Sequence, residues 1–221
     1  MNWENSKALT PLKRDFLNSF FARNTGFFLT GGSALGVFHF AHRLSYDLDF
    51  FTTGERVDWH LVDNDVRAVA EKVGAQLRSI TVSPGFRRYQ LVRGTDSEIL
   101  DFVHEQVPQL DERKDAFGIV RVDTLRDILA NKIGTLVGRC DPKDIVDLFF
   151  LERHGWKALD HLDDARRKEG GLDLAVIAHL LNGVHFEKLP AFMIAEIAPS
   201  ELEAFVRKLE REFSALAFPA P

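Results

Sequence analysis

The sequence predicts an α+β protein in which strands and helices occupy the first half of the chain and helices alone occupy the second half. Three observations lead to this prediction. The chain has 221 residues, 45% of them hydrophobic, which is enough to bury a core without disulfides or a structural metal. Up to about residue 122, short strand-like runs alternate with helical patterns. From Asp123 onward every apolar pattern has helical spacing, so we expect two domains, residues 1–122 and 123–221.

The first expected element is a helix near residues 10–23. Thr10 followed by Pro11 is typical of an N-cap and first helical position, and large apolar residues then recur at helical spacing. The next expected elements are a strand in "GFFLT" (26–30), a turn at Gly31-Gly32, a helix from Ser33 to His42 and a strand in "YDLDFFT" (46–52).

A further helix and three strands complete the first half. Asp58 can cap a helix over about 59–73. The strands are expected in "AQLRSITV" (75–82), "FRRYQLVRG" (86–94) and "SEILDFV" (97–103), separated by turns at 83–85 and 94–96. In the second half, helices are expected in "DTLRDILANKIGTLVGR" (123–139), in "PKDIVDLFFLERHG" (142–155) and near 159–168, 172–183 and 200–215.

Charge and cysteine content limit the kinds of partner and compartment. The formal net charge is −5, so no overall positive field attracts the protein to nucleic acid, and any such contact must be local. A single cysteine, Cys140, excludes an internal disulfide and a thiolate metal cage, in agreement with a reducing compartment. The apolar runs are far shorter than a bilayer span, and residues 1–15 lack the order of a signal peptide. We therefore expect a cytoplasmic protein with no membrane partner.

Two aspartates one residue apart form the first candidate site. Successive side chains of a strand alternate faces, so Asp47 and Asp49 project to one side while their apolar neighbours point into the core. Two like charges this close repel each other, and the pair is stable either at a solvated strand end or around a divalent cation. Carboxylate oxygens suit Mg²⁺ or Mn²⁺. The alternative is a plain exposed edge strand.

The glycine turn ahead of the same segment favours phosphate. Gly31 and Gly32 allow the backbone to approach an anion closely, and Ser33 offers a hydroxyl beside unpaired N–H groups at the start of the next helix. An ordinary tight connection between a strand and a helix is the alternative. Together with the carboxylate pair, however, the turn indicates a nucleoside triphosphate and its metal ions.

A third carboxylate interrupts a later apolar strand. If the strand that contains Asp101 neighbours the strand of Asp47 and Asp49, then Asp101 can complete a metal cluster and act as a base. Otherwise it is a polar position on a half-exposed strand.

Charged residues also share a face with apolar residues in two consecutive helices of the second half. Lys132 falls within the apolar stripe of the helix at 123–139, and Arg139 follows one heptad later on the same face. A lysine in such a stripe needs an anion or a route to water. In the next helix, Asp144 and Asp147 lie three residues apart on one face. Each pattern alone is compatible with surface charge, and the two together indicate a shared polar cleft.

Two weaker patterns remain. Arg87, Arg88 and Arg93 form the best local basic patch, which could contact a nucleic-acid acceptor such as tRNA or could be a solvated strand face. His39 and His42 have a possible metal spacing, but their helix contains no carboxylate or cysteine, which favours an ordinary packed role.

Two segments resemble a known protein family. "LTGGSALGVFHFAHRLSYDLDFF" and "LRDILANKIGTLVGRCDPKDIVDLFFL" are similar to the AbiEii/AbiGii-type toxin nucleotidyltransferases, a branch of the polymerase-β-like superfamily. The resemblance covers roughly residues 25–155. It implies a nucleotidyltransferase-like mixed β-sheet with flanking helices, followed by the C-terminal helical domain. It also implies two divalent metal ions, Mg²⁺ or Mn²⁺, and transfer of a nucleoside monophosphate from an NTP to an acceptor hydroxyl.

The resemblance also assigns roles to individual residues. By this assignment Gly31, Gly32 and Ser33 hold the triphosphate, Arg43 and Ser45 brace the loop or contact phosphate, Asp47, Asp49 and Asp101 bind metal and act in catalysis, Lys132 contacts the phosphates, and Asp144 is a charge partner or activates the acceptor. The family further implies a toxin that acts on tRNA or protein and is paired with an antitoxin. The alternatives are a nucleotidyltransferase of a small-molecule acceptor and a non-catalytic nucleotide-binding or antitoxin-binding module.

Overall fold

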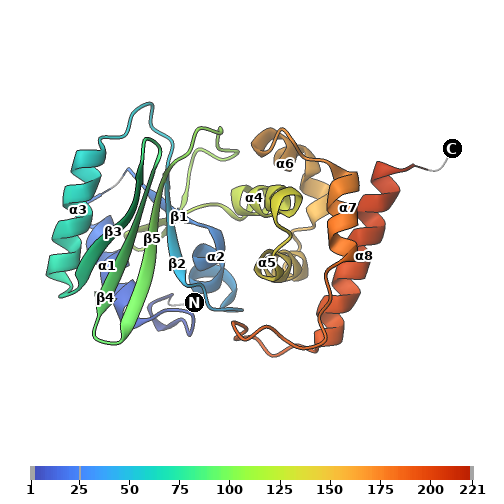
Figure 1. The fold of residues 1–221 in the computed structure, drawn as a ribbon, viewed down its shortest axis with the longest axis horizontal. Coiled ribbons are helices and arrows are strands. Elements are labelled where there is room, and N and C mark those ends of the chain that lie inside the picture. Colours follow the sequence, from blue (N-terminus) through green and yellow to red (C-terminus); the bar gives the residue numbers. More distant parts are fainter. Residues whose placement is uncertain (1–2, 25, 220–221) are drawn as a thin grey trace. The chain divides into compact units, whose positions relative to one another are not determined.

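The computed structural model describes residues 3–24 and 26–219. The chain divides into two compact units, Met1–Thr124 and Leu125–Pro221 (Figure 1). Among the described residues, every strand belongs to the first unit, and the second unit contains helices and their connections. The predicted α+β fold is therefore confirmed. The division into domains 1–122 and 123–221 stays a prediction, because compactness does not show that each part folds by itself.

The first unit is built on a mixed β-sheet. Its strands are β1 (Phe28–Thr30), β2 (Asp47–Thr52), β3 (Gln76–Ser83), β4 (Phe86–Arg93), β5 (Asp96–His104), β6 (Asp115–Phe117) and β7 (Val120–Val122). They are ordered β3-β4-β5-β2-β1-β7-β6. β2 runs antiparallel to β1 and parallel to β5, while β1 runs parallel to β7. The sequence analysis did not predict β6 and β7, which have three residues each, whereas the equally short β1 lies within the strand expected at 26–30.

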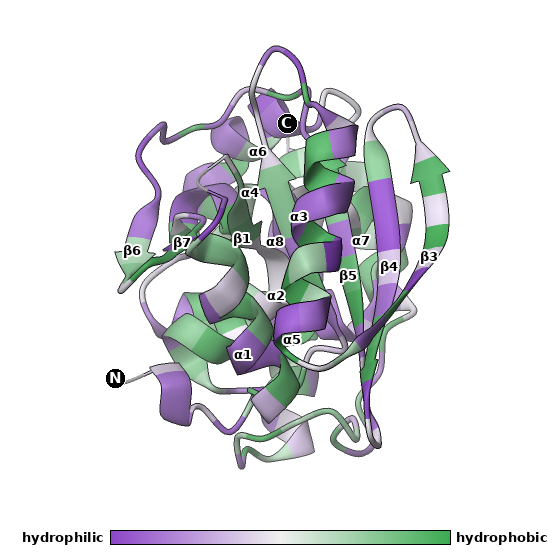
Figure 2. Cartoon of the chain, turned by 90° about the vertical axis from the view of Figure 1, so that its left-hand side faces the viewer, coloured by the Kyte–Doolittle hydropathy of each residue, from purple (hydrophilic) through white to green (hydrophobic). Residues whose placement is uncertain are grey.

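The first unit also contains helices. They are η1 (Trp3–Asn5), α1 (Pro11–Phe21), α2 (Gly31–Ala34) with its continuation η2 (Leu35–Phe40), and α3 (Trp59–Lys72). Figure 2 shows α1 and α3 in front of the sheet. Phe20 of α1 contacts Phe50 of β2 and Phe102 of β5, whose rings stack with centroids 4.6 Å apart. The face covered by α1 and α3 therefore holds the core, and the alternate residues of β2 and β5 point to the other face.

Both predicted helix caps are confirmed. The Thr10 hydroxyl accepts a hydrogen bond from the backbone N–H of Lys13 at 3.1 Å. The Asp58 carboxylate accepts hydrogen bonds from His60 N and Leu61 N at 3.0 and 3.2 Å. Each cap satisfies N–H groups that the first helical turn cannot pair internally.

The segment after the glycine turn differs from the expected regular helix over 33–42. The helix begins at Gly31, two residues earlier than predicted, and from Leu35 it widens into a π-helix. It ends at Ala41, whose φ of 51° is left-handed. A widened helix is uncommon and is found most often at functional sites, and here it follows directly from the candidate phosphate turn.

The second unit contains the helices α4 (Leu125–Gly138), α5 (Pro142–Arg153), η3 (Ala158–His161), α6 (Leu162–Lys168), α7 (Leu174–Asn182) and α8 (Pro199–Ala217). α4 packs against α5 and α6, and α7 packs against α8. Asp141 and Asp173 cap α5 and α7 through their carboxylates. All of the expected helices are present, with the segment predicted at 159–168 divided into η3 and α6. No helix of the described residues is long and apolar enough to cross a membrane.

Candidate active site

The parallel pairing of β2 and β5 brings the three predicted carboxylates of the first unit onto one face of the sheet. Asp49 lies directly opposite Asp101 in the register of the two strands, and Asp47 lies two residues before Asp49. Asp47 and Asp49 are half-buried and Asp101 is 5% exposed. The intervening Leu48 is fully buried on the other side, as the predicted alternation requires. Asp101 was proposed on the condition that its strand neighbours the strand of Asp47 and Asp49. This condition is met, because β5 pairs with β2.

The glycine turn touches this carboxylate cluster directly. Gly31 has a φ of +69°, and a Cβ at this position would lie 2.6 Å from Asp49 Oδ2. A Cβ on Gly32 would lie 2.0 Å from Arg43 Nη2. Both positions are therefore crowded by the chain's own side chains, which is a reason for glycine that the sequence did not show. The turn and the aspartates lie against each other.

Three polar side chains of the turn and the following loop hold this part of the cluster in place. Ser33 is buried, and its hydroxyl donates to the backbone carbonyl of Asp47. Ser45 Oγ donates to Asp47 Oδ1 at 2.8 Å. Arg43 is buried as well, and its Nη1 donates to Leu44 O at 2.9 Å. In this structure the Ser33 hydroxyl therefore fixes the start of β2 and does not face solvent.

Arg88 of β4 forms a two-pronged ion pair with Asp101. Nε lies 2.7 Å from Oδ1, and Nη2 lies 2.6 Å from Oδ2. The hydrogen bond to Asp101 raises the pKa of Arg88, and the negative charges of Asp101, Asp47 and Asp49 raise it further. The guanidinium therefore experiences the field of all three carboxylates.

The three arginines of β4 do not form the single basic patch that the sequence suggested. Arg87 and Arg93 lie on the face covered by helices, where Arg87 Nε is 3.5 Å from Asp63 and Arg93 Nη1 is 2.8 Å from Asp15. Arg88 lies on the other face because side chains alternate along the strand. Each arginine is paired with a carboxylate, so a site for nucleic acid cannot be read from these three residues together.

The donor atoms of the cluster fit a hard divalent cation. Asp47, Asp49 and Asp101 provide carboxylate oxygens, the ligands that Mg²⁺ and Mn²⁺ prefer. In the described part of the chain, however, no three histidine, cysteine, aspartate or glutamate side chains are already grouped as a metal site. In this structure Ser45 donates a hydrogen bond to Asp47, and Arg88 donates one to Asp101.

Two supporting residues were missed by the sequence reasoning. Asp123, at the end of β7, is 1% exposed and accepts a hydrogen bond from Thr30 Oγ1 at 2.8 Å, directly before the glycine turn. Lys13 of α1 donates to the backbone carbonyl of Ser45 and forms an ion pair with Glu98 at 3.1 Å. The available signal for each was a charged residue in a segment that becomes buried. The partner of each residue, however, lies far away in the sequence.

The charged residues predicted in the second unit form one ion-pair cluster. Lys132 Nζ lies 2.7 Å from Asp144 and 2.6 Å from Asp147, and Arg139 Nε lies 2.9 Å from Asp144. Burial alone would raise the pKa of Asp144, but Lys132 and Arg139 outweigh it and hold this pKa below its ordinary value. The Lys132 side chain is 8% exposed, whereas that of Arg139 is 51% exposed. The two helices therefore share a polar cluster, in which Arg139 reaches solvent.

The remaining titratable candidates have packed environments. Burial, followed by the charges of Asp144 and Asp141, raises the pKa of Cys140 to about 11, which favours the neutral thiol. Burial also lowers the pKa of His39, whose ring packs against Phe117 with centroids 5.5 Å apart. The environment of His39 agrees with the ordinary packed role that the sequence favoured.

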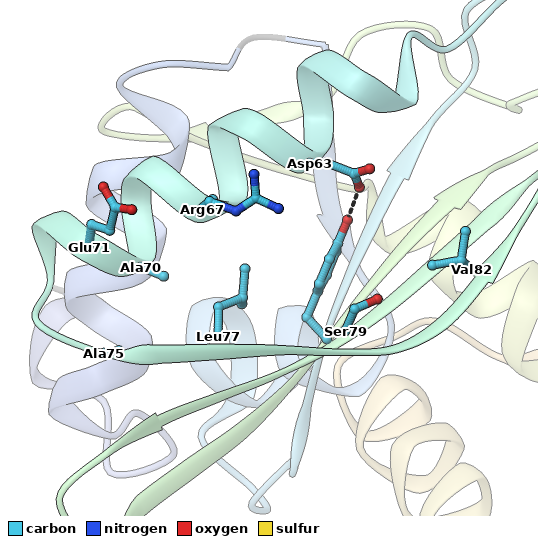
Figure 3. Close-up of a pocket in the computed structure, with 9 residues that line it drawn as sticks. Asp63, Arg67, Ala70, Glu71, Ala75, Leu77, Ser79 and Val82 are labelled. Atoms are coloured by element: carbon cyan, nitrogen blue, oxygen red, sulfur yellow. Dashed lines mark hydrogen bonds between the residues drawn. The ribbon is translucent and has the colours of Figure 1, made fainter.

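A separate hollow of about 390 Å³ lies between α3 and β3 (Figure 3). It is lined by Asp63, Arg67, Ala70, Glu71, Ala75, Leu77, Ser79, Val82 and Tyr89. The Tyr89 hydroxyl donates to Asp63, and burial followed by this hydrogen bond raises the pKa of Tyr89. None of the three clustered aspartates lines this hollow, which lies on the face of the sheet covered by α3.

Comparisons with known proteins agree with this architecture. The family model described as "Nucleotidyl transferase AbiEii toxin, Type IV TA system" matches residues 15–220. An uncharacterized protein of Aquifex aeolicus (strain VF5) is 29% identical over 195 residues, which cover 85% of this chain and 87% of that protein. The crystal structure of JHP933 from Helicobacter pylori matches 93% of this chain and 92% of its own, with 17% identity and a TM-score of 0.58. MenT4, a nucleotidyltransferase toxin from Mycobacterium tuberculosis H37Rv, matches 92% of this chain and 82% of its own, with 17% identity and a TM-score of 0.55.

Proposed function

Because the chain belongs to the AbiEii nucleotidyltransferase toxin family, we propose that it transfers a nucleoside monophosphate from a nucleoside triphosphate to an acceptor hydroxyl, and that Mg²⁺ or Mn²⁺ is required. The observation that carries this proposal is the placement of Asp49 opposite Asp101, with Asp47 on the same face and Gly31 in contact with Asp49. Carboxylates beside a glycine turn suit a nucleotide that arrives with its metal ions.

The roles of the aspartates follow from their surroundings. Asp47 and Asp49 bind the divalent ions, with Ser45 orienting the carboxylate of Asp47 at 2.8 Å. Asp101 is the third ligand or the base that accepts the proton of the acceptor hydroxyl. When bound, the ions supply positive charge to the attacking and leaving oxygens of the transferred phosphoryl group.

We assign phosphate binding in the first unit to the glycine turn. The Ser33 hydroxyl already donates to the backbone carbonyl of Asp47. We therefore assign the phosphate contacts of the turn to the backbone N–H groups of Gly31, Gly32 and Ser33. Arg43 packs against Gly32 and braces this turn. The phosphate contact expected of Lys132 stays a prediction from the sequence; in the helical unit its Nζ is paired with Asp144 at 2.7 Å and with Asp147 at 2.6 Å.

The acceptor and the partner are proposed from the family. Its description names a toxin of a toxin-antitoxin system, which supports an antitoxin as the regulatory partner, and tRNA or protein is the acceptor that we propose for such a toxin. The net charge of −5 provides no broad electrostatic attraction to RNA, so an RNA acceptor would be held by local contacts. A cytoplasmic location stays a prediction from the sequence.

The proposal is tested with each α-labelled NTP in turn, Mg²⁺ and total tRNA, followed by separation of labelled RNA, protein and small molecules. We expect label on tRNA, on protein or on the enzyme itself. Asp47→Ala should reduce transfer by at least on the order of 10²–10³-fold, because it removes charge stabilisation at the reacting phosphate. Asp163→Ala is the matched control, since the Asp163 side chain is 95% exposed and lies in the helical unit. Full activity of Asp47→Ala would reject the assigned site, and label only on a small molecule would replace the proposed acceptor.

A further inference from the structure

We propose that Arg88 is a built-in counterion that occupies the third carboxylate, Asp101, and competes with a divalent cation for it. This inference rests on the proposed function, because it concerns the metal site assigned there. It identifies a residue, Arg88, that controls how readily the cluster binds metal in the absence of substrate.

The geometry of the pair is that of a strong and specific contact. Arg88 and Asp101 are direct partners in the antiparallel pairing of β4 and β5. The guanidinium binds both carboxylate oxygens, at 2.7 and 2.6 Å. Parallel double hydrogen bonds between guanidinium and carboxylate are among the strongest polar contacts in proteins. Both oxygens of Asp101 are thus engaged by a cation that belongs to the protein.

The position of Asp101 makes this contact relevant to metal binding. Asp101 faces Asp49 across β2 and β5, so a cation bound by both aspartates would lie beside the guanidinium. The charges of Asp47 and Asp49 also act on Arg88. Among these four side chains Arg88 carries the one positive charge, so its guanidinium offsets part of the negative charge of the three aspartates.

Unequal burial indicates which partner moves. The Asp101 side chain is 7% exposed and is fixed on a central strand, whereas that of Arg88 is 43% exposed on β4. A nearly buried carboxylate that loses its partner needs another cation, because an unpaired charge at such a position is costly. The exposed guanidinium can leave toward solvent or toward an anionic ligand, since arginine binds phosphate as well as carboxylate. Exchange of Arg88 for a divalent cation therefore leaves Asp101 paired and frees Arg88 for a triphosphate.

The test is a Mn²⁺ titration without nucleotide, in which free Mn²⁺ is followed by electron paramagnetic resonance. Arg88→Met removes the competing charge and should tighten Mn²⁺ binding about tenfold, which corresponds to about 1.4 kcal/mol. Arg88→Lys keeps a positive charge but loses the planar fork, so its gain should be smaller than that of Arg88→Met. Arg93→Met is the matched control, because Arg93 is on the same strand but pairs with Asp15 on the other face. It should leave Mn²⁺ affinity unchanged.

A second set of variants shows whether the effect acts through Asp101. The gain from Arg88→Met should disappear when it is combined with Asp101→Asn, and circular dichroism confirms that each variant is folded. Two results would overturn this inference and leave the proposed function standing. One is Mn²⁺ binding that depends on Asp47 but does not change in Arg88→Met. The other is a gain in Mn²⁺ affinity that persists in the Asp101→Asn background. If no variant binds Mn²⁺ in an Asp47-dependent manner, the metal site of the proposed function is rejected, and this inference is rejected with it.

Discussion

Replacing Gly31 with alanine should disable the carboxylate cluster at a modest cost in stability. Gly31 has a φ of +69°, and an alanine in this left-handed region costs roughly 1–2 kcal/mol of unfolding free energy. In addition, the new Cβ would lie 2.6 Å from Asp49 Oδ2, well inside ordinary van der Waals contact. The Asp49 carboxylate must then move by about 1 Å, and a displacement of this size can reduce catalysis on the order of 10²-fold.

Gly74 provides a matched control for the backbone term. Its φ is +68°, nearly the same as that of Gly31, but a Cβ at this position would meet nothing within 4 Å. Gly74→Ala should therefore lose a similar amount of unfolding free energy in urea denaturation while keeping its NTP-dependent transfer and its Mn²⁺ affinity. The difference between the two variants isolates the contact with Asp49. Wild-type transfer by Gly31→Ala, or an equal loss of transfer in Gly74→Ala, would refute this reasoning.

Two further predictions concern the ion-pair cluster of the helical unit. Lys132→Met leaves the fully buried carboxylates of Asp144 and Asp147 without their shared cation, so it should lower the unfolding free energy in urea by about 3–5 kcal/mol. Lys143→Met on the partly exposed side of α5 should change the unfolding free energy by less than about 0.5 kcal/mol, and equal losses would contradict the role of Lys132 as the cation shared by the two buried carboxylates. The second prediction is a pH dependence. Because the pKa of Asp144 is lower in the folded state than its ordinary value of 3.8, its ionised form stabilises the fold above that pH, and this contribution is lost as the pH falls through the folded pKa. The stability difference between wild type and Asp144→Asn should therefore be constant near neutral pH and should shrink below about pH 4, and a constant difference down to pH 2 would contradict it.

The sequence alone determined the features that depend on local periodicity and local chemistry. Alternation along a strand places Asp47 and Asp49 on one face and Leu48 in the core, and the structure confirms this. Thr10 and Asp58 cap their helices as expected, because a cap depends only on residues within one turn. The glycine-serine turn with this aspartate pair, taken together with the charged helical segment that contains Lys132 and Asp144, was also specific enough to identify the family.

Only the tertiary structure decided which strands are neighbours, and with them the composition of the site. β5 pairs with β2 although β3 and β4 lie between them in the sequence, and this pairing alone brings Asp101 opposite Asp49. The contact of Arg88 with Asp101 follows from the register of β4 on β5, which periodicity does not fix. Periodicity shows which face of a strand a side chain occupies, but it does not show which side chains of other strands or helices lie against it. The partners of these charged groups come from long-range packing, and so the sequence could propose the aspartates but not the arginine that neutralises one of them.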